Sequence, residues 1–274
     1  MLRSMITSTN TMTQLQRQLD VIGHNLSNID TQGYKRTETN FNELLRQQFN
    51  NQPDRTKEIG RLTDFGIRQG TGARLTTSTV FTQGSLKQTG RKLDVAFTNP
   101  GQFLQVNADG EIRYTRNGSL YLSPNENGLL TLVTSEGHQV LDENQNPITF
   151  DDTFSDLAIS QNGTITASSK DGNELPQIAN LGIVRVDKPS ALEQAGGNLY
   201  SINAGNANIN DVLTYLDGDN RQLIGLQQGS LEMSNVDLSK EMTELMLSQR
   251  SYQMNAKSIT MGDQMLGLIN GVRS

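Results

Sequence analysis

Apolar residues near the start of the chain recur with the period of a helix. The set is spaced at intervals of three and four residues and consists of Met12, Leu15, Leu19, Ile22 and Leu26. Polar residues fill the intervening positions, and this spacing is typical of a coiled-coil seam. We therefore predict a helix over residues 1–30, followed by Gly33, which can adopt the left-handed conformation that closes a helix.

A second helix is predicted at the other end, within residues 228–274. It carries two apolar seams, offset by two positions, which suggests more than one neighbour. The first seam consists of Leu238, Met242, Leu245, Tyr252, Ala256 and Ile259. The second consists of Leu247, Met254, Met261, Met265, Leu268 and Val272. Ser234 and Asp237 resemble a capping box before this helix, and Asn270-Gly271 should end it.

The pattern between the two helices changes to that of β structure. Residues 31–73 are rich in glutamine, asparagine and glycine, which predicts an extended linker. Residues 74–227 contain short apolar runs separated by turn signals, which predicts an antiparallel central β domain. The hairpin-type turn signals are Asp109-Gly110, Asn117-Gly118, Asn127-Gly128 and Asn162-Gly163. The expected fold class is α+β, with the helix at residues 1–30 paired with residues 231–274 as a coiled coil.

The composition argues against several functions but does not point to one. The net charge is −6 and the sequence contains no cysteine. An acidic chain does not favour nucleic-acid binding, and a chain without cysteine has no disulfide or thiolate chemistry. The N-terminus lacks the apolar segment of a cleaved signal peptide. The chain is thus expected either to stay in the cytosol or to leave the cell through a machine that reads another signal.

No catalytic or metal-binding constellation is visible. His24 and His138 lie far apart in the sequence, without suggestive carboxylate spacing around them. The acidic stretch that starts at Asp142 imitates a calcium loop, but Pro147 stands where glycine is required, so we interpret it as a turn. We predict no enzyme activity, no cofactor, no metal and no small-molecule substrate.

Three blocks of sequence resemble the bacterial flagellar rod and hook axial proteins. The first block is Asn25-Leu-Ser-Asn28-Ile-Asp-Thr31-Gln-Gly33-Tyr34-Lys35-Arg36. The second block runs from Gln83-Gly84 to Leu93-Asp94-Val95-Ala96 and continues through Tyr114 to Ser119. The third block is Ser234-Asn235-Val236-Asp237-Leu238-Ser-Lys-Glu241-Met242, which runs on to Lys257. Together they cover both ends and about the first half of the middle, in the family's order.

The resemblance implies a structural subunit of the flagellar basal-body rod. Such proteins pair their terminal helices in an inner tube, polymerise helically and transmit torque from motor to hook. Implied partners are copies of the chain, other rod and hook proteins and the flagellar export apparatus. The expected location is the basal body, in the cell envelope, reached without a cleaved signal peptide. A turn at Thr98–Phe103 departs from the usual rod pattern, which leaves distal rod, proximal rod or a rod–hook relative open.

Two sets of residues are expected to carry assembly. The interface set is Met12, Leu15, Leu19, Ile22, Leu26, Leu238, Met242, Leu245, Tyr252, Ile259 and Met265. The signature set is Asn25, Asn28, Thr31, Gly33, Tyr34, Ser234, Asn235 and Asp237. Within it, Asn25, Asn28, Gly33, Asn235 and Asp237 are expected to fix the helix ends. An alternative function is a secreted surface-binding module that uses its coiled coil only to form closed oligomers. A cell-wall glycan hydrolase would need two placed carboxylates, and no pair stands out.

Overall fold

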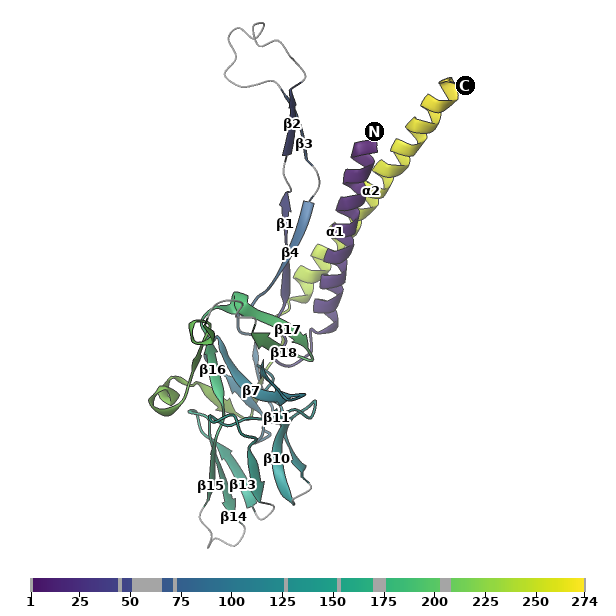
Figure 1. The fold of residues 1–274 in the computed structure, drawn as a ribbon. Helices are drawn as coiled ribbons and strands as arrows, with labels where there is room; N and C mark the ends of the chain where they lie inside the picture. The colour runs from purple at the N-terminus through teal and green to yellow at the C-terminus, as the bar shows by residue number, and fades with distance from the viewer. Residues whose placement is uncertain are drawn as a thin grey trace. The chain divides into compact units, whose positions relative to one another are not determined.

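A computed structural model of the chain describes residues 2–43, 46–50, 66–70, 73–125, 128–151, 154–169, 176–202 and 208–273. Two helices, α1 (Leu2–Ser27) and α2 (Leu238–Arg273), lie at the two ends of the chain, and antiparallel β structure lies between them in the sequence (Figure 1). The predicted α+β class is therefore confirmed. The chain forms two compact units. Unit 1 comprises residues 1–26, 37–78 and 237–274, and unit 2 comprises residues 27–36 and 79–236.

The helix ends follow local side-chain chemistry. Helix α1 ends at Ser27, three residues before the predicted bound at residue 30. Helix α2 begins after Asp237, whose carboxylate accepts the backbone N–H groups of Ser239 at 2.8 Å and Lys240 at 3.2 Å. The predicted capping box was wrong, because Asp237 caps the helix and Ser234 accepts instead the N–H of Val236. The predicted stop at Asn270-Gly271 was also wrong, since α2 continues to Arg273.

Unit 1 also contains two short antiparallel ribbons. Strand β1 (Thr37–Glu43) pairs with β4 (Ala73–Thr79), and β2 (Arg46–Asn50) pairs with β3 (Gly66–Gly70). Parts of the stretch predicted as an extended linker are thus hydrogen-bonded strands. Polar residues dominate these strands, so the alternation that usually marks a strand is weak here. Residues 44–45, 51–65 and 71–72 of that stretch lie outside the described residues.

Unit 2 is built on a ten-stranded sheet in which all pairings between its described strands are antiparallel. The main order is β12-β10-β11-β7-β8-β18-β17, with β9 on β10, β16 on β7 and β19 on β16. These strands are β7 (Gln102–Ala108), β8 (Glu111–Thr115), β9 (Leu120–Pro124), β10 (Leu129–Thr134), β11 (Gln139–Val140), β12 (Thr149–Asp151), β16 (Ile183–Val186), β17 (Leu192–Gly196), β18 (Leu199–Ile202) and β19 (Leu213–Tyr215).

Smaller sheets complete unit 2. A three-stranded sheet is formed by β13 (Phe154–Ile159), β14 (Thr164–Ser169) and β15 (Gln177–Asn180). Two further pairs are β20 (Leu226–Gln228) with β6 (Val95–Phe97), and β21 (Ser230–Glu232) with β5 (Leu86–Gln88). Short 3-10 helices are η2 (Pro189–Ala191), η3 (Ile209–Asp211) and η4 (Gly218–Leu223). The last strand before α2 is therefore paired with a strand from near the start of unit 2.

The predicted turns differ in outcome. Asp109-Gly110 joins β7 to β8 with positive φ at both residues, 55° and 82°, as a tight hairpin requires. Asn162-Gly163 joins β13 to β14. The hairpin at Asn117-Gly118 was wrong, because the flanking strands β8 and β9 do not pair. A Cβ on Gly118 would lie 1.7 Å from the carbonyl oxygen of Val95, so the glycine serves close backbone approach instead. Asn127 lies outside the described residues.

The core of unit 2 consists of two apolar clusters. The larger one contains fully buried residues such as Val95 and Phe97 of β6 and Leu104 of β7. In the smaller one, Phe103 and Tyr200 stack edge-to-face at a centroid distance of 5.8 Å. The adjacent residues Phe103 and Leu104 of β7 belong to different clusters and are both buried, so this strand is covered on both of its faces.

Candidate functional site

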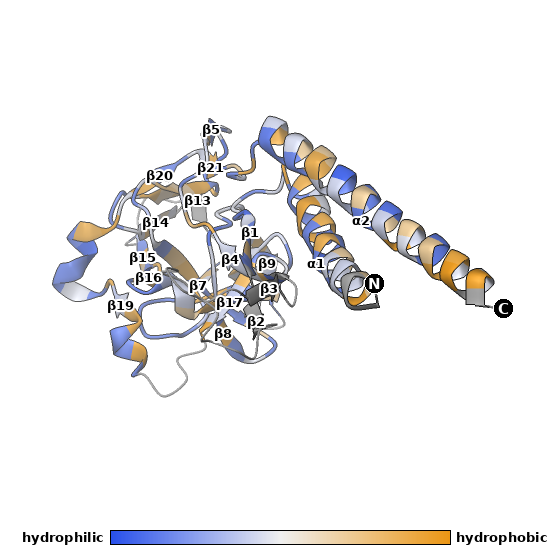
Figure 2. Ribbon diagram, turned by 90° about the horizontal axis from the view of Figure 1, so that it is seen from above, coloured by the Kyte–Doolittle hydropathy of each residue, from blue (hydrophilic) through white to orange (hydrophobic). Residues whose placement is uncertain are grey.

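Helices α1 and α2 lie side by side in unit 1 and run antiparallel (Figures 1 and 2). Near the end of α1, Asn25 Nδ2 donates to Glu241 Oε2 at 3.2 Å. One heptad back along α1, Gln18 Oε1 accepts from Ser248 Oγ at 2.9 Å. The contacting residue numbers fall along α1 as they rise along α2, so the two helices run in opposite directions.

The predicted interface residues of α1 are divided in their burial. Leu15 and Ile22 are buried, with 6% and 2% of their surface exposed. Met12, Leu19 and Leu26 are only half-buried. The apolar stripe that appears continuous in the sequence therefore has an inner row and an outer row.

The predicted interface residues of α2 are divided in the same way. Leu245, Tyr252 and Ile259 are half-buried. Leu238, Met242 and Met265 are exposed to 48%, 44% and 47%. The sequence placed Met242 on the inner face, but the adjacent Glu241 is buried there. Asn25 gives this carboxylate a polar partner, which hydrophobic periodicity alone does not register.

The second apolar seam of α2 is uncovered in the single chain. Its exposed members are Leu247, Met254, Met261, Met265, Leu268 and Val272. Figure 2 shows orange segments recurring along the length of α2. A row of exposed apolar side chains of this length marks an interaction surface in a soluble protein.

Asn25 shapes the end of α1 by imitating a peptide group. Its Nδ2 donates to the carbonyl of Thr37 at 2.9 Å, and its Oδ1 accepts the N–H of Thr37 at 3.0 Å. The Asn25 side chain therefore holds the first residue of β1 as a neighbouring strand would. In the segment that follows α1, Thr31 Oγ1 donates to Asn28 Oδ1 at 3.1 Å.

Gly33 takes the positive φ that the sequence predicts, at 70°. Its N–H donates to the carbonyl of Glu232 at 2.8 Å. A Cβ at this position would lie 2.7 Å from the backbone of Arg116, so both conformation and space require glycine. The adjacent Tyr34 is buried at 1% exposure.

Three charged residues of unit 2 form a fully buried group, the junction cluster: Lys35, Arg116 and Glu232. Lys35 Nζ lies 2.5 Å from Glu232 Oε1, and Arg116 Nε lies 2.8 Å from Glu232 Oε2. Glu232 Oε1 also accepts the backbone N–H of Gly84 at 2.9 Å. The cluster thus joins the segment after α1, the segment before β5, the β8 end and the strand before α2.

The junction cluster contains two basic side chains and one carboxylate. Burial lowers the pKa of Lys35, and the nearby Arg116 guanidinium lowers it further, while Glu232 opposes both. Neither Arg116 nor Glu232 was singled out from the sequence as a site residue. Arg116 lies inside the second resembling block and Glu232 lies two residues before the third, and only this placement could have marked them.

Asn235 joins three segments of unit 2 rather than capping α2. Its Oδ1 accepts the N–H of Arg36 at 2.7 Å. Its Nδ2 donates to the carbonyls of Val80 at 2.8 Å and Thr82 at 3.0 Å. Four hydrogen-bonding groups on a short side chain make asparagine suited to such a crossing point.

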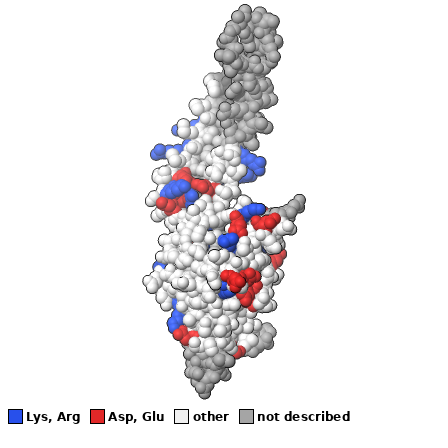
Figure 3. All heavy atoms as spheres, turned by 90° about the vertical axis from the view of Figure 1, so that its left-hand side faces the viewer, with Lys and Arg blue, Asp and Glu red and all other residues white. Residues whose placement is uncertain are grey.

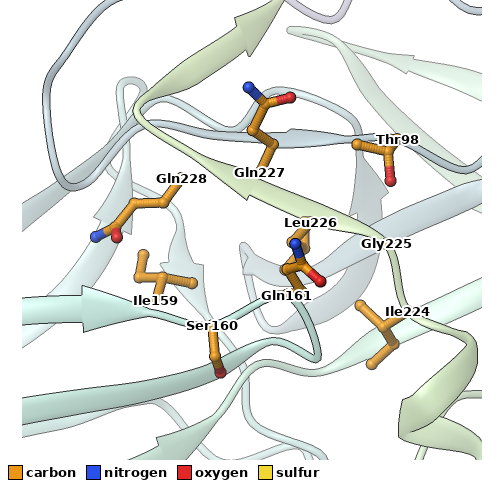
Figure 4. A pocket seen from close by; sticks show the side chains of 9 residues that line it. All are labelled: Thr98, Ile159, Ser160, Gln161, Ile224, Gly225, Leu226, Gln227 and Gln228. Carbon is orange, nitrogen blue, oxygen red and sulfur yellow. The ribbon is translucent and has the colours of Figure 1, made fainter.

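An open pocket in unit 2, with a volume of about 460 Å³, carries no catalytic group (Figure 4). Its polar lining comes from Thr98, Ser160 and the glutamines 161, 227 and 228. Ser160 and Gln228 already bond to the protein itself, Ser160 to Thr164 and Gln228 to Lys92. The lining contains no charged or aromatic side chain, so we assign no ligand to it.

Surface charge is mixed. Figure 3 shows acidic and basic side chains in small adjoining groups, and several of them pair, such as Arg185 with Asp187 at 2.9 Å. In the described part of the chain, no three histidine, cysteine or carboxylate side chains gather as a metal site would need. None of the helices among the described residues combines the length and hydropathy of a membrane span.

Comparison with known proteins identifies the family. Residues 5–35 match the flagella basal body rod protein model, residues 99–167 the flagellar hook protein FlgE/F/G D1 domain model, and residues 227–272 the flagellar basal body rod FlgEFG protein C-terminal model. The flagellar hook-basal body complex protein FlhP of Bacillus subtilis is 51% identical over the full length of both chains.

Two rod proteins are also similar along nearly the whole chain. The flagellar basal-body rod protein FlgG of Bacillus subtilis is 33% identical over 97% of each chain. The protein of the same name from Borreliella burgdorferi is 32% identical over 100% of this chain and 99% of its own. With matches at both ends and in the middle, this chain belongs to the flagellar basal-body rod protein family.

Proposed function

We propose that this chain is a structural subunit of the flagellar basal-body rod and has no catalytic role. It assembles with copies of itself and with other axial proteins into a helical polymer. Contacts that repeat head-to-tail without closing produce such a polymer. The polymer transmits torque from the motor to the hook.

The observation that carries this proposal is the uncovered apolar seam of α2 in a chain similar to rod proteins along its whole length. Met254 and Leu268, exposed to 70% and 71%, belong to that seam. Burying each such side chain against a neighbouring subunit would contribute about 1.5–3 kcal/mol before the cost of association. The half-buried row of α1, which contains Leu19, offers a second apolar surface to the same neighbours. We therefore propose that the terminal helices form the polymer contacts as coiled-coil elements.

Within the family, we propose that the chain corresponds to the hook-basal body complex protein rather than to FlgG. The identity is 51% to the former and 33% to the latter within one organism, Bacillus subtilis. We also propose that the chain leaves the cell through the flagellar export apparatus. The absence of cysteine from the sequence is compatible with passage in an unfolded state, since no disulfide can form on the way.

Deletion of the gene in its host tests the function. We expect loss of swimming, and basal bodies whose rods stop short and carry no hook. The stopping point would place the subunit along the rod. Complete basal bodies with normal hooks would refute the proposal and favour the secreted binding module, which would form closed oligomers of fixed size.

A further inference from the structure

The face on which α2 meets α1 repeats every seven residues. Its buried and half-buried positions, at alternating intervals of four and three residues, include Glu241, Leu245, Ser248, Tyr252, Asn255, Ile259, Gly262 and Leu266. Every second position is apolar, and the positions between are Glu241, Ser248, Asn255 and Gly262. The contact face is therefore a stack of apolar layers separated by polar or small ones.

Helix α1 carries the matching pattern. Asn25 and Gln18 are separated by seven residues, and the buried Ile22 and Leu15 lie at equivalent places between and beyond them. Asn25 faces Glu241, and Gln18 faces Ser248. At the far end, a Cβ on Gly262 would lie 3.2 Å from Cγ of Met5, so the alignment holds along the pair.

The apolar layers alone do not define this alignment. A slip of one heptad, about 10 Å along the helix, would again place apolar side chains opposite apolar side chains. A slip in either direction would break the Asn25–Glu241 pair. One slip would carry Glu241 beyond the end of α1, and the other would carry Asn25 to a position before the start of α2 and set Gln18 opposite Glu241. Glu241 and Asn25 are both 1% exposed, and separating a buried carboxylate from a polar partner is unfavourable.

We propose that the Asn25–Glu241 pair is a register lock, which restricts α1 and α2 to one antiparallel alignment. A buried polar pair that fixes register at some cost in stability is a known device in coiled coils. Here the lock would fix which side chains of α2 remain on its outer, uncovered seam. The inference rests on the proposed role of the helix pair in assembly.

Cysteine pairs test the lock, because the chain has no cysteine of its own. Met5→Cys with Gly262→Cys reports the native alignment. Met5→Cys with Asn255→Cys, or with Ile269→Cys, reports a slip of one heptad in either direction. Each pair is oxidised in dilute full-length protein, and intramolecular links are separated from linked dimers by electrophoresis. In the parent chain we expect the native link to exceed either slipped link by at least about tenfold.

The same three pairs are then placed in an Asn25→Leu/Glu241→Leu background. Replacing both partners by apolar residues leaves no buried charge unpaired, so the helices should still pair. We expect the slipped links to form at yields similar to the native link. A Leu15→Ala background serves as the control, because it weakens an apolar layer. It should lower the yield of the native link without allowing the slipped links to form.

Two results would overturn the lock. Exclusive formation of the native link in the double-leucine background would show that the flanking segments of the helices fix the alignment. Equal yields of all three links in the parent chain would show that there is no fixed alignment. Both readouts are independent of motility, so they can fail while the deletion phenotype supports the rod function, and the reverse.

Discussion

The carboxylate of Glu232 is the most heavily used side chain of the junction cluster. It accepts from two buried cations and from the backbone N–H of Gly84. A carboxylate that satisfies two buried cations cannot be replaced by a neutral group without leaving charge uncompensated. The residues that hold the crossing segments of unit 2 together are thus polar, although the surrounding core is apolar.

Glu232→Gln should destabilise the protein by about 3–5 kcal/mol, because Lys35 and Arg116 would then be buried without a carboxylate. Chemical denaturation of the purified protein measures the change in unfolding free energy. Glu193→Gln, at an exposed position of β17, is the matched control and should change it by less than about 0.5 kcal/mol. Equal effects of the two changes would show that the cluster is not needed for stability.

Tyr121 should ionise at a lower pH than Tyr114 and Tyr200. Burial, followed by the neighbouring Tyr215, raises the pKa of Tyr114, and burial, followed by Tyr34, raises the pKa of Tyr200. Hydrogen bonds from Ser119 and Arg91 lower the pKa of Tyr121. The phenol of Tyr121 should therefore ionise below the ordinary value of 10.0, at a pH where Tyr114 and Tyr200 stay protonated in the folded protein.

The consequence for stability has a defined sign. The unfolded chain releases the phenolic protons of Tyr114 and Tyr200 near pH 10.0, and the folded chain retains them. Their contribution to the unfolding free energy should therefore fall as pH rises above that value. Ultraviolet absorbance of tyrosinate follows these ionisations. Tyr121→Phe should remove the step below pH 10.0 that we assign to Tyr121, and Tyr200→Phe should leave that step unchanged. An unchanged step in Tyr121→Phe would contradict the assignment.

At the scale of elements, α2 presents two different faces. One face is layered and meets α1, and the other is apolar and uncovered. Because Met254 is 70% exposed, a change there should leave the fold of the single chain intact. Its effect on assembly can therefore be separated from its effect on folding.

Met254→Asp should preserve the helical content and the unfolding temperature of the purified chain. When the gene for this variant replaces the parent gene in the host, swimming should be abolished. The reason is that a charge would have to be buried against the neighbouring subunit. Gln253→Asp introduces the same charge at the adjacent exposed position and should support swimming. Normal motility with Met254→Asp would remove this seam from the assembly contact.

How far the sequence predicts these elements depends on the kind of signal. Heptad spacing predicted α1 to within a few residues, and Asp109-Gly110 predicted its hairpin, because both signals are local. Within the predicted seam of α2, Leu245, Tyr252 and Ile259 are half-buried, whereas Met242 is exposed and its neighbour Glu241 is buried. Periodicity did not reveal this because the partner of Glu241, Asn25, is distant in sequence. Glu232 was missed for the same reason, since its partners come from remote segments.

At the scale of the whole molecule, the ends and the middle of the chain have separate tasks. Unit 1 carries the apolar helix surfaces that we propose for assembly, and unit 2 carries a closed apolar core with its own buried charges. Similarity to rod proteins extends across both. We therefore propose that both units take part in one axial structure.

Locating the chain in isolated basal bodies tests this account most directly. Basal bodies purified from the host are labelled with gold-conjugated antibodies raised against this chain and viewed by electron microscopy, with the deletion strain as the control for background labelling. We expect gold along the rod, between the motor and the hook. Unlabelled rods, with the chain recovered instead from the cell surface, would contradict it.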